Sequence, residues 1–479
     1  MFDLATAAVE GALAAGAGYA DARAVLSATE GLQARNGVLE GLQRSESAGV
    51  GVRALIGSSW GFFATSDLGD RAARRAGEEA AAIARASGRV PGSPLELADV
   101  PVVEDHWDSG WDEHPRDVSL AEKGDLLVGA TATMAAVAGV SVAEATVSFW
   151  DTEKWFVSSQ GHRISQHIVE SGSTMSATAV GEHETQRRSW GGIGGHWGTR
   201  GYELVRATDL PGNAPRVAEE AVALLSAPHC PAGVTDLILG PEQLGLQIHE
   251  SVGHAIELDR ILGWEAAFAG TSFLDLSRLG RLRYGSEHMN VTADATLPGA
   301  LGTFGYDDEG TPASRVDIVR EGTWVGVLTG RDSAAVAGLP PGGMVRADGW
   351  ARLPIVRMTN VGLLPGDSSL EEMVAATADG IYMETNRSWS IDDKRLNFQF
   401  GCEVGREVKD GKLGRLLRNP TYTGITPQFW GSLDMVGGPD EWIFWGTPNC
   451  GKGQPSQWGH TGHPSVPARF RGVQVGVRG

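Results

Sequence analysis

Two histidines lie five positions apart in the segment HESVGH, residues 249–254, and a glutamate directly follows the first of them. Imidazole nitrogens are common zinc ligands, and a carboxylate beside a metal-bound water can accept a proton from it. The pattern is H-E-x-x-x-H, one residue longer than the H-E-x-x-H of many zinc peptidases. The spacing therefore predicts a zinc ion, Zn2+, held by His249 and His254, with Glu250 as the general base.

The extra residue requires a local change of helix geometry. The segment 241–262 has helical features, because Pro241 suits a first helical position and a stripe of apolar side chains follows it. On a regular α-helix, residues four apart lie about 40° from alignment, and residues five apart lie about 140° from it. A turn hydrogen-bonded from residue i to i+5 would return both histidines to one face, and Gly253 lets the backbone deform easily. We therefore expect a bulged or broken helix at residues 250–254.

The alternative is a regular helix in which His249 and His254 are ordinary, partly buried histidines that share no metal. A second His-Glu pair at residues 183–184 has no histidine five positions after its own, and it shows what chance alone produces. A local distortion at residues 250–254 is required by the metal interpretation and by nothing in the alternative.

A catalytic zinc usually takes three protein ligands and leaves a fourth position for water. The candidates for the third ligand are Glu257, Asp259, Cys450, His460 and His463. Cys450 is favoured because a thiolate is a soft ligand that suits zinc, and because the glycines of the stretch TPNCGKGQP would let this loop approach the ion. His460 and His463 could instead bind substrate or contact a ligand, although a surface position is the simpler interpretation.

The composition excludes several classes of partner. The chain has 479 residues and a formal net charge of −19, which repels phosphate backbones and anionic lipids, so we expect neither nucleic acid nor a membrane as partner. It has no run of 18 apolar residues and no basic leader, so we expect neither a membrane span nor a signal peptide. Three cysteines form no disulfide framework, which fits a reducing, cytoplasmic location, and we expect Cys230 and Cys402 to be small buried side chains.

Strands with a few helices segregated from them place the chain in the α+β class. We expect helices at 2–16, 69–87, 214–226, 241–262 and 369–377, another that begins at the Ser119/Glu122 capping box, and strands at 50–56, 60–65, 145–150, 155–159, 163–170, 234–239, 315–320 and 324–329. Pro228 and Pro231 interrupt the chain. A boundary there gives an N-terminal domain of antiparallel strands with helices at 1–228, and a β-rich C-terminal domain at 229–479 that carries the zinc-binding helix.

The segment HESVGHAIELD, residues 249–259, resembles the helix of the TldD/PmbA family of metallopeptidases, specifically its catalytic TldD branch. Further stretches are similar to the same family, namely YDDEGTPA at 306–313, VRMTN at 356–360 with LPG at 364–366, and NCGKGQP at 449–455. The order and spacing of these motifs cover roughly residues 235–475, whereas the N-terminal half agrees only in general layout.

The resemblance implies zinc ligands at His249, His254 and Cys450, and a catalytic glutamate at Glu250. It implies an α+β N-terminal domain and a barrel-like C-terminal domain. It also implies dimers, commonly a TldD-type subunit with a metal-free TldE/PmbA-like partner, or else a homodimer. The implied substrates are unfolded peptides, including precursors of peptide natural products, which are held in an enclosed cleft through backbone strand pairing.

Three residues depart from the family pattern, because Ser251 stands in place of alanine and Ala255 and Leu258 stand in place of glycine. These larger side chains put the substrate range in doubt, but not the metal. The first hypothesis for the function is a zinc peptidase. The alternatives are a binding or regulatory subunit of the same fold without turnover, and a metal-dependent tailoring enzyme that cleaves an amide.

Overall fold

The computed structural model describes residues 1–90, 92, 94–192, 194–268 and 270–476. Residue 269 and residues 477–479 of the expected C-terminal domain therefore lie outside the described residues. The chain is 24% helix and 42% strand, and it contains two separate large sheets, which confirms the α+β class.

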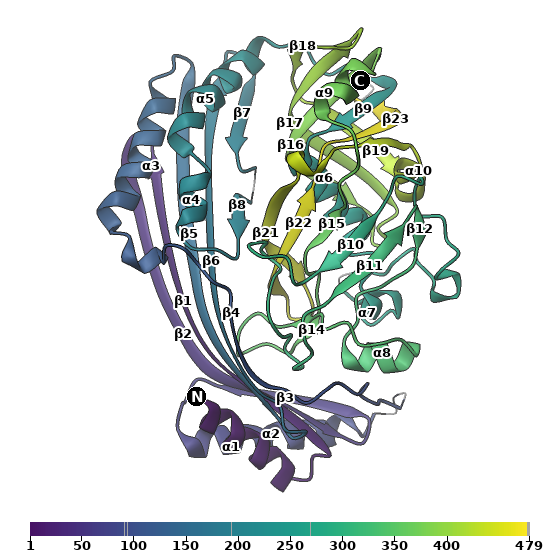
Figure 1. The fold of residues 1–479 in the computed structure, drawn as a ribbon. Coiled ribbons are helices and arrows are strands. Elements are labelled where there is room, and N and C mark those ends of the chain that lie inside the picture. Colours follow the sequence, from purple (N-terminus) through teal and green to yellow (C-terminus); the bar gives the residue numbers. More distant parts are fainter. Residues whose placement is uncertain (91, 93, 193, 269, 477–479) are drawn as a thin grey trace.

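The N-terminal half is built on one eight-stranded sheet with the order β3-β2-β1-β5-β6-β4, in which β7 and β8 also pair with β6. Its strands are β1 (Tyr19–Arg35), β2 (Val38–Ile56), β3 (Ser59–Thr65), β4 (Glu104–Asp108), β5 (Val140–Ser158), β6 (Arg163–Val180), β7 (Thr185–Trp190) and β8 (His196–Gly198). Among the described strands of this sheet, β4 alone pairs in parallel, with β6. Strands β1, β2, β5 and β6 form long curved ribbons along one side of the molecule (Figure 1).

Helices cover one face of this sheet. They are α1 (Phe2–Ala14), α2 (Asp70–Ser87), α3 (Leu120–Ala135), α4 (Glu203–Ala207) and α5 (Leu210–Ser226), with a short 3₁₀ turn η1 (Pro115–Asp117). Because side chains alternate along a strand, the even positions of β1, such as Ala22 and Leu32, pack under the helices. The odd positions, such as Arg23 and Val25, face the C-terminal half, which lies on the other side of the sheet (Figure 1).

The C-terminal half contains a closed barrel of five strands, because β16-β9-β23-β19-β17 returns to β16, with β18 and β20 on its edges. The bounds are β9 (Gly233–Leu239), β16 (Asp379–Ile391), β17 (Asn397–Lys409), β18 (Lys412–Leu417), β19 (Thr421–Ile425), β20 (Leu433–Val436) and β23 (Ala468–Val475). The barrel-like form implied by the family resemblance is therefore confirmed. A core that includes Phe400, Tyr422 and Phe470 fills its interior, since closure gives the inward-facing side chains one shared volume.

Smaller elements surround the barrel. One small sheet has four strands, β10 (Val291–Asp294), β11 (Arg315–Arg320), β12 (Thr323–Trp324) and β15 (Val361–Leu363). Two further sheets have two strands each. They are β13 (Val345–Arg346) with β14 (Ile355–Val356), and the hairpin β21 (Ile443–Lys452) with β22 (Gln457–Ser465). The helices are α6 (Pro241–Ile248), a π-turn η2 (His249–Gly253), α7 (Leu258–Ile261), α8 (Arg331–Ala337), α9 (Leu370–Ala375) and α10 (Thr426–Gly431), with 3₁₀ turns η3 (Leu276–Arg278) and η4 (Pro439–Glu441).

Most expected elements are confirmed, and three differ. The strand expected at 324–329 is wrong, because only Thr323–Trp324 pair with β11, opposite Arg320 and Val319. The strands expected at 145–150 and 155–159 are one strand, β5, because the polar residues between them continue the pairing with β1, as in Thr152 opposite Ser27. The helix expected at 241–262 changes to a π-turn at His249–Gly253, as the histidine spacing required, but beyond the turn it continues only as the short α7. Within the described residues, no helix is both long enough and apolar enough to cross a bilayer.

Buried ion pairs join the two halves at the motif YDDEGTPA. Asp308 accepts hydrogen bonds from Arg23 at 3.1 Å and from Lys154 at 2.8 Å, and Glu309 pairs with Arg53 at 3.0 Å. Burial opposes the ionisation of Asp308, but Lys154 and Arg23 outweigh this and lower its pKa to about 2. The motif therefore anchors the barrel half to the face of the N-terminal sheet that carries no helices.

Candidate metal centre

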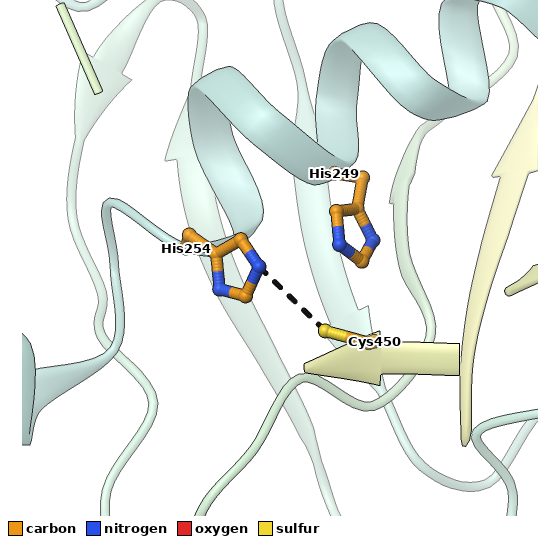
Figure 2. A group of neighbouring side chains, drawn as sticks. All are labelled: His249, His254 and Cys450. Carbon is orange, nitrogen blue, oxygen red and sulfur yellow. Dashed lines mark hydrogen bonds between the residues drawn. The ribbon is translucent and has the colours of Figure 1, made fainter. Parts of the chain in front are cut away.

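The helix distortion required by the spacing of the two histidines is present. The backbone N–H of His254 donates to the carbonyl of His249 at 3.1 Å, which is a hydrogen bond from residue i+5 to residue i. The two rings lie 4.8 Å apart, centroid to centroid, and both side chains extend from the same side of the helix (Figure 2). The expected distortion is therefore confirmed as one π-turn, His249–Gly253.

A close approach explains the glycine inside this turn. A Cβ atom at Gly253 would lie 2.0 Å from the sulfur of Met358, far below any normal contact distance. A side chain at this position would therefore force the buried Met358 side chain to move. The neighbouring Ser251 is also tightly held, because its hydroxyl donates to the carbonyl of Gln247 at 2.6 Å and accepts from the indole N–H of Trp430 at 2.9 Å.

Cys450 on β21 lies opposite the two histidines (Figure 2). Its Sγ is 3.6 Å from Nε2 of His254, and one ligand atom of each of the three residues lies within 4.8 Å of the others. A tetrahedral zinc with two nitrogen ligands and one sulfur ligand needs separations of roughly 3.3–3.6 Å between these atoms. The donor set therefore fits zinc in type and, after small side-chain movements, in size.

The site is enclosed, since His249, His254 and Cys450 are each at most 4% exposed. Burial opposes ionisation of the thiol, but His254 and the Arg357 guanidinium outweigh it and lower the pKa of Cys450. The thiolate form of Cys450, a candidate zinc ligand, is therefore stabilised by His254 and Arg357.

His463, which the sequence offered only as a candidate, is buried behind His249. Its Nδ1 donates to the carbonyl of Val361 at 3.0 Å, and its Nε2 lies 2.8 Å from Nδ1 of His249. Burial and the adjacent His249 lower the pKa of His463 well below its usual range, so its ring is neutral. Its Nε2 must then accept the Nδ1–H of His249, which leaves Nε2 of His249 without a proton and able to bind a metal.

Glu257 has the same effect on His254. Its carboxylate accepts the Nδ1–H of His254 at 3.0 Å, so Nε2 of His254, which faces Cys450, carries no proton. Lys452 lies 3.4 Å from Glu257 and 2.8 Å from Asp259, and all three side chains are buried. Glu257 and Asp259 were two of the candidates for the third ligand. In the structure they contact His254 and Lys452, respectively, and lie outside the group of three potential ligands.

Glu250 contacts an arginine that the sequence did not indicate. Nη1 of Arg395 donates to Oε2 of Glu250 at 2.7 Å, and Arg395 lies in the turn between β16 and β17 with a left-handed φ of 63°. A residue other than glycine in this conformation is strained, and such strain is often found at functional sites. No spacing in the sequence could have revealed Arg395, because 145 residues separate it from Glu250.

His460 lies apart from the three candidate ligands. Its Nδ1 is 2.8 Å from Oε2 of Glu170 on β6, and its ring packs 4.9 Å from that of Trp150 on β5, centroid to centroid. It lines a cavity of about 400 Å³ between the N-terminal sheet and the hairpin β21–β22. The cysteines Cys230 and Cys402 are buried in the core of the C-terminal half, as expected.

A second group of potential ligands, His114, Asp151 and His167, fits a metal less well. Nδ1 of His114 accepts the backbone N–H of Arg116, so this nitrogen is not free for a metal, and Nε2 faces Asp151 at 3.4 Å. The Arg116 guanidinium occupies the same carboxylate at 3.0 Å. These contacts form an ion-pair network near the surface, in which the Arg116 side chain is 62% exposed.

Known protein families and relatives match this chain along nearly its whole length. Models of the PmbA/TldA metallopeptidase domains match it at residues 20–84 for domain 1, 113–227 for the central domain and 232–476 for the C-terminal domain. A metalloprotease of Methanothermobacter thermautotrophicus is 30% identical over 96% of this chain and 95% of its own length. This chain belongs to the PmbA/TldA metallopeptidase family. The family resemblance seen in the sequence is thereby confirmed.

Other members extend the comparison. A zinc metalloprotease TldD homolog of Saccharolobus solfataricus is 29% identical over 43% of this PmbA/TldA chain and 44% of its own length. The solved structure of TldE from Thermococcus kodakarensis has the same fold, with a TM-score of 0.71 and 15% identity over 98% of this chain and 99% of that one. The conserved architecture thus spans both halves of this PmbA/TldA protein.

Proposed function

We propose that this chain is a zinc-dependent peptidase of the H-E-x-x-x-H type, in which His249, His254 and Cys450 hold one Zn2+ ion and Glu250 is the general base. The single observation that carries the proposal is the π-turn, because it brings two imidazoles, five positions apart, to the side of the helix that faces Cys450. The name of the Saccharolobus solfataricus relative supports zinc as the metal.

When bound, zinc would polarise the substrate carbonyl and lower the pKa of a bound water to about 7. Glu250 takes the proton at its carboxylate and passes it to the leaving amine. Arg395 orients that carboxylate through their 2.7 Å contact. His463 and Glu257 fix the tautomers of the two metal-binding histidines, so that both present an unprotonated Nε2.

The substrates that we propose are unfolded peptides or precursors of peptide natural products. The support is the cavity beside the hairpin β21–β22, whose walls come from both halves of the chain and contain backbone as well as apolar side chains. An extended peptide bound mainly through its backbone would explain a loose sequence preference.

We also propose that the chain acts in the cytoplasm as a heterodimer with a TldE/PmbA-like subunit, with a homodimer as the alternative. The shared fold of the TldE structure supports this pairing. The proposed domain division is 1–228 and 229–479, which agrees with the separate sheets of the two halves.

The deciding experiment is a peptide-cleavage assay on the purified chain, with and without a TldE/PmbA-like subunit and with and without a chelator. We expect about one zinc per chain and cleavage that the chelator abolishes and added zinc restores. A zinc-free preparation that cleaves peptides would refute the proposal. Zinc binding without any cleavage would favour the regulatory-subunit alternative, and cleavage of small amides alone would favour the tailoring enzyme.

A further inference from the structure

The cavity between the N-terminal sheet and the hairpin β21–β22 contains two arginines that form no ion pair with a carboxylate among the described residues. Arg346 on β13 and Arg357, directly after β14, both line it. Among the described residues, no carboxylate oxygen lies within 4.0 Å of either guanidinium. In a chain with a net charge of −19, two buried or half-buried cations without a carboxylate partner are unexpected.

The hydrogen bonds of these two arginines go to neutral groups. Arg357 donates to the carbonyls of Cys450 and Gln457, and Arg346 donates to the carbonyl of Met358. The Nε of each guanidinium has no partner. Burial, and after it the neighbouring Arg357, lower the pKa of Arg346 to about 10.

The other charged groups of the cavity are already paired. Arg23 and Lys154 both contact Asp308, and Glu170 contacts His460. Asp348 is exposed at the rim, where its carboxylate accepts the backbone N–H of Trp458 at 2.9 Å. None of these carboxylates pairs with Arg346 or Arg357, and the Cys450 thiolate already faces His254, so a bound carboxylate would supply the missing ion pair.

The cavity lies next to the proposed metal centre. Arg357 donates to the backbone carbonyl of Cys450, and Gly459, which pairs with Cys450 across the hairpin, lines the cavity. A Cβ at Gly459 would lie 2.3 Å from the Arg357 guanidinium, so glycine is needed for this arginine to occupy its place. The aromatic side chains of Trp150, Phe304 and Trp350 supply apolar walls.

We propose that this cavity is a carboxylate-binding subsite for the peptide substrate, in which Arg346 contacts the carboxylate and Arg357 adds positive charge behind it. The inference rests on the proposed peptidase function and names a feature of its substrate. The carboxylate has two sources, the C-terminus of the peptide or an aspartate or glutamate side chain. Guanidinium groups suit either source, because they donate two parallel hydrogen bonds to a carboxylate.

The test measures peptide binding by calorimetry to the full-length, zinc-loaded Glu250→Gln protein, so that no cleavage is needed. The probes are N-acetylated penta-alanine with a free or an amidated C-terminus, and amidated versions in which the central residue is glutamate or glutamine. Within at least one pair, we expect the carboxylate form to bind about 10- to 100-fold more tightly. The pair that discriminates identifies the source of the carboxylate.

Arg346→Gln in the same background should remove this discrimination, and Arg346→Lys should keep part of it. The matched control is Arg71→Gln on the exposed surface of α2, which should leave the discrimination unchanged. The proposal is overturned by equal binding within both pairs, by no saturable binding of any carboxylate probe up to about 10 mM, or by full discrimination in Arg346→Gln. Discrimination without hydrolysis in the parent enzyme would reject the peptidase and leave the subsite standing.

Discussion

Nδ1 of His249 lies 2.8 Å from Nε2 of His463, a histidine 214 residues further along the chain. The carbonyl of Val361 fixes the proton of His463 on the opposite nitrogen, so the orientation of His249 depends on a strand that the sequence motif does not contain. Contacts of this kind align metal ligands before the metal arrives.

Replacement of His463 should therefore weaken metal binding without removing a ligand. In His463→Phe, the Nδ1–H of His249 loses its acceptor, and we expect zinc affinity to fall about 10- to 100-fold. Competition against a chelator of known affinity measures this. The control is His183→Phe, because the His183 side chain is 87% exposed. Equal affinities of the two variants would remove His463 from the site.

Cys450→Ala should lower the zinc content well below the expected one ion per chain, because two imidazoles alone hold zinc weakly. Metal analysis after dialysis gives the stoichiometry. Cys230→Ala is the matched control, since it removes a buried cysteine that lies outside the candidate metal cluster. An unchanged zinc content in Cys450→Ala would assign the third position to another residue.

Glu250→Gln should keep zinc and lose hydrolysis. The amide matches the carboxylate in size but cannot accept the proton, so we expect kcat to fall by about 10²- to 10⁴-fold. Steady-state peptide cleavage and zinc content are measured on the same samples. Glu287→Gln, at an exposed glutamate, serves as the control. Retained turnover in Glu250→Gln would mean that a different group is the base.

Gly253→Ala should destabilise the π-turn, because the new Cβ would lie 2.0 Å from the sulfur of Met358. We expect the free energy of unfolding to fall by about 1–3 kcal/mol, with lower zinc occupancy. Urea unfolding measures the stability. Gly129→Ala, at an exposed position of α3 with open space around it, should instead be neutral or slightly stabilising. The same result for both variants would mean that the turn tolerates a side chain.

Asp308 should give the protein an acid-sensitive contact between its halves. Its pKa of about 2 in the folded protein lies below that of an unfolded aspartate, about 3.9. The ionised carboxylate therefore stabilises the fold fully above pH about 4, by about 2–3 kcal/mol, and this contribution is lost as the pH falls toward 2.

Asp308→Asn should remove this part of the pH dependence and lower stability at neutral pH, because Arg23 and Lys154 lose their counter-charge. Unfolding free energies measured from pH 7 down to the acid limit of folding test this. Asp117→Asn, at an exposed position, is the comparison. A curve for Asp308→Asn that is parallel to that of the parent protein would show that another group controls the acid response.

The local parts of this structure could be predicted because they depend on neighbouring residues. Five residues exceed one helical turn by more than a residue, so two histidines at that spacing can share a face only if the helix changes its hydrogen bonding, as it does at His254. Alternating side chains and turn residues similarly indicated the hairpin of β2 and β3, whose strands pair from Ile56 and Ser59.

The sequence by itself thus determined the motif, the need for a π-turn and the α+β class. Only the tertiary structure brought one of the five candidates for the third ligand, Cys450, next to His254, because Cys450 lies on the hairpin β21–β22, 196 positions further along the chain. The same holds for Arg395 beside Glu250 and for the closure of the barrel. Such contacts depend on strand order and on which surfaces pack together, and neither property is encoded in the few residues around a motif.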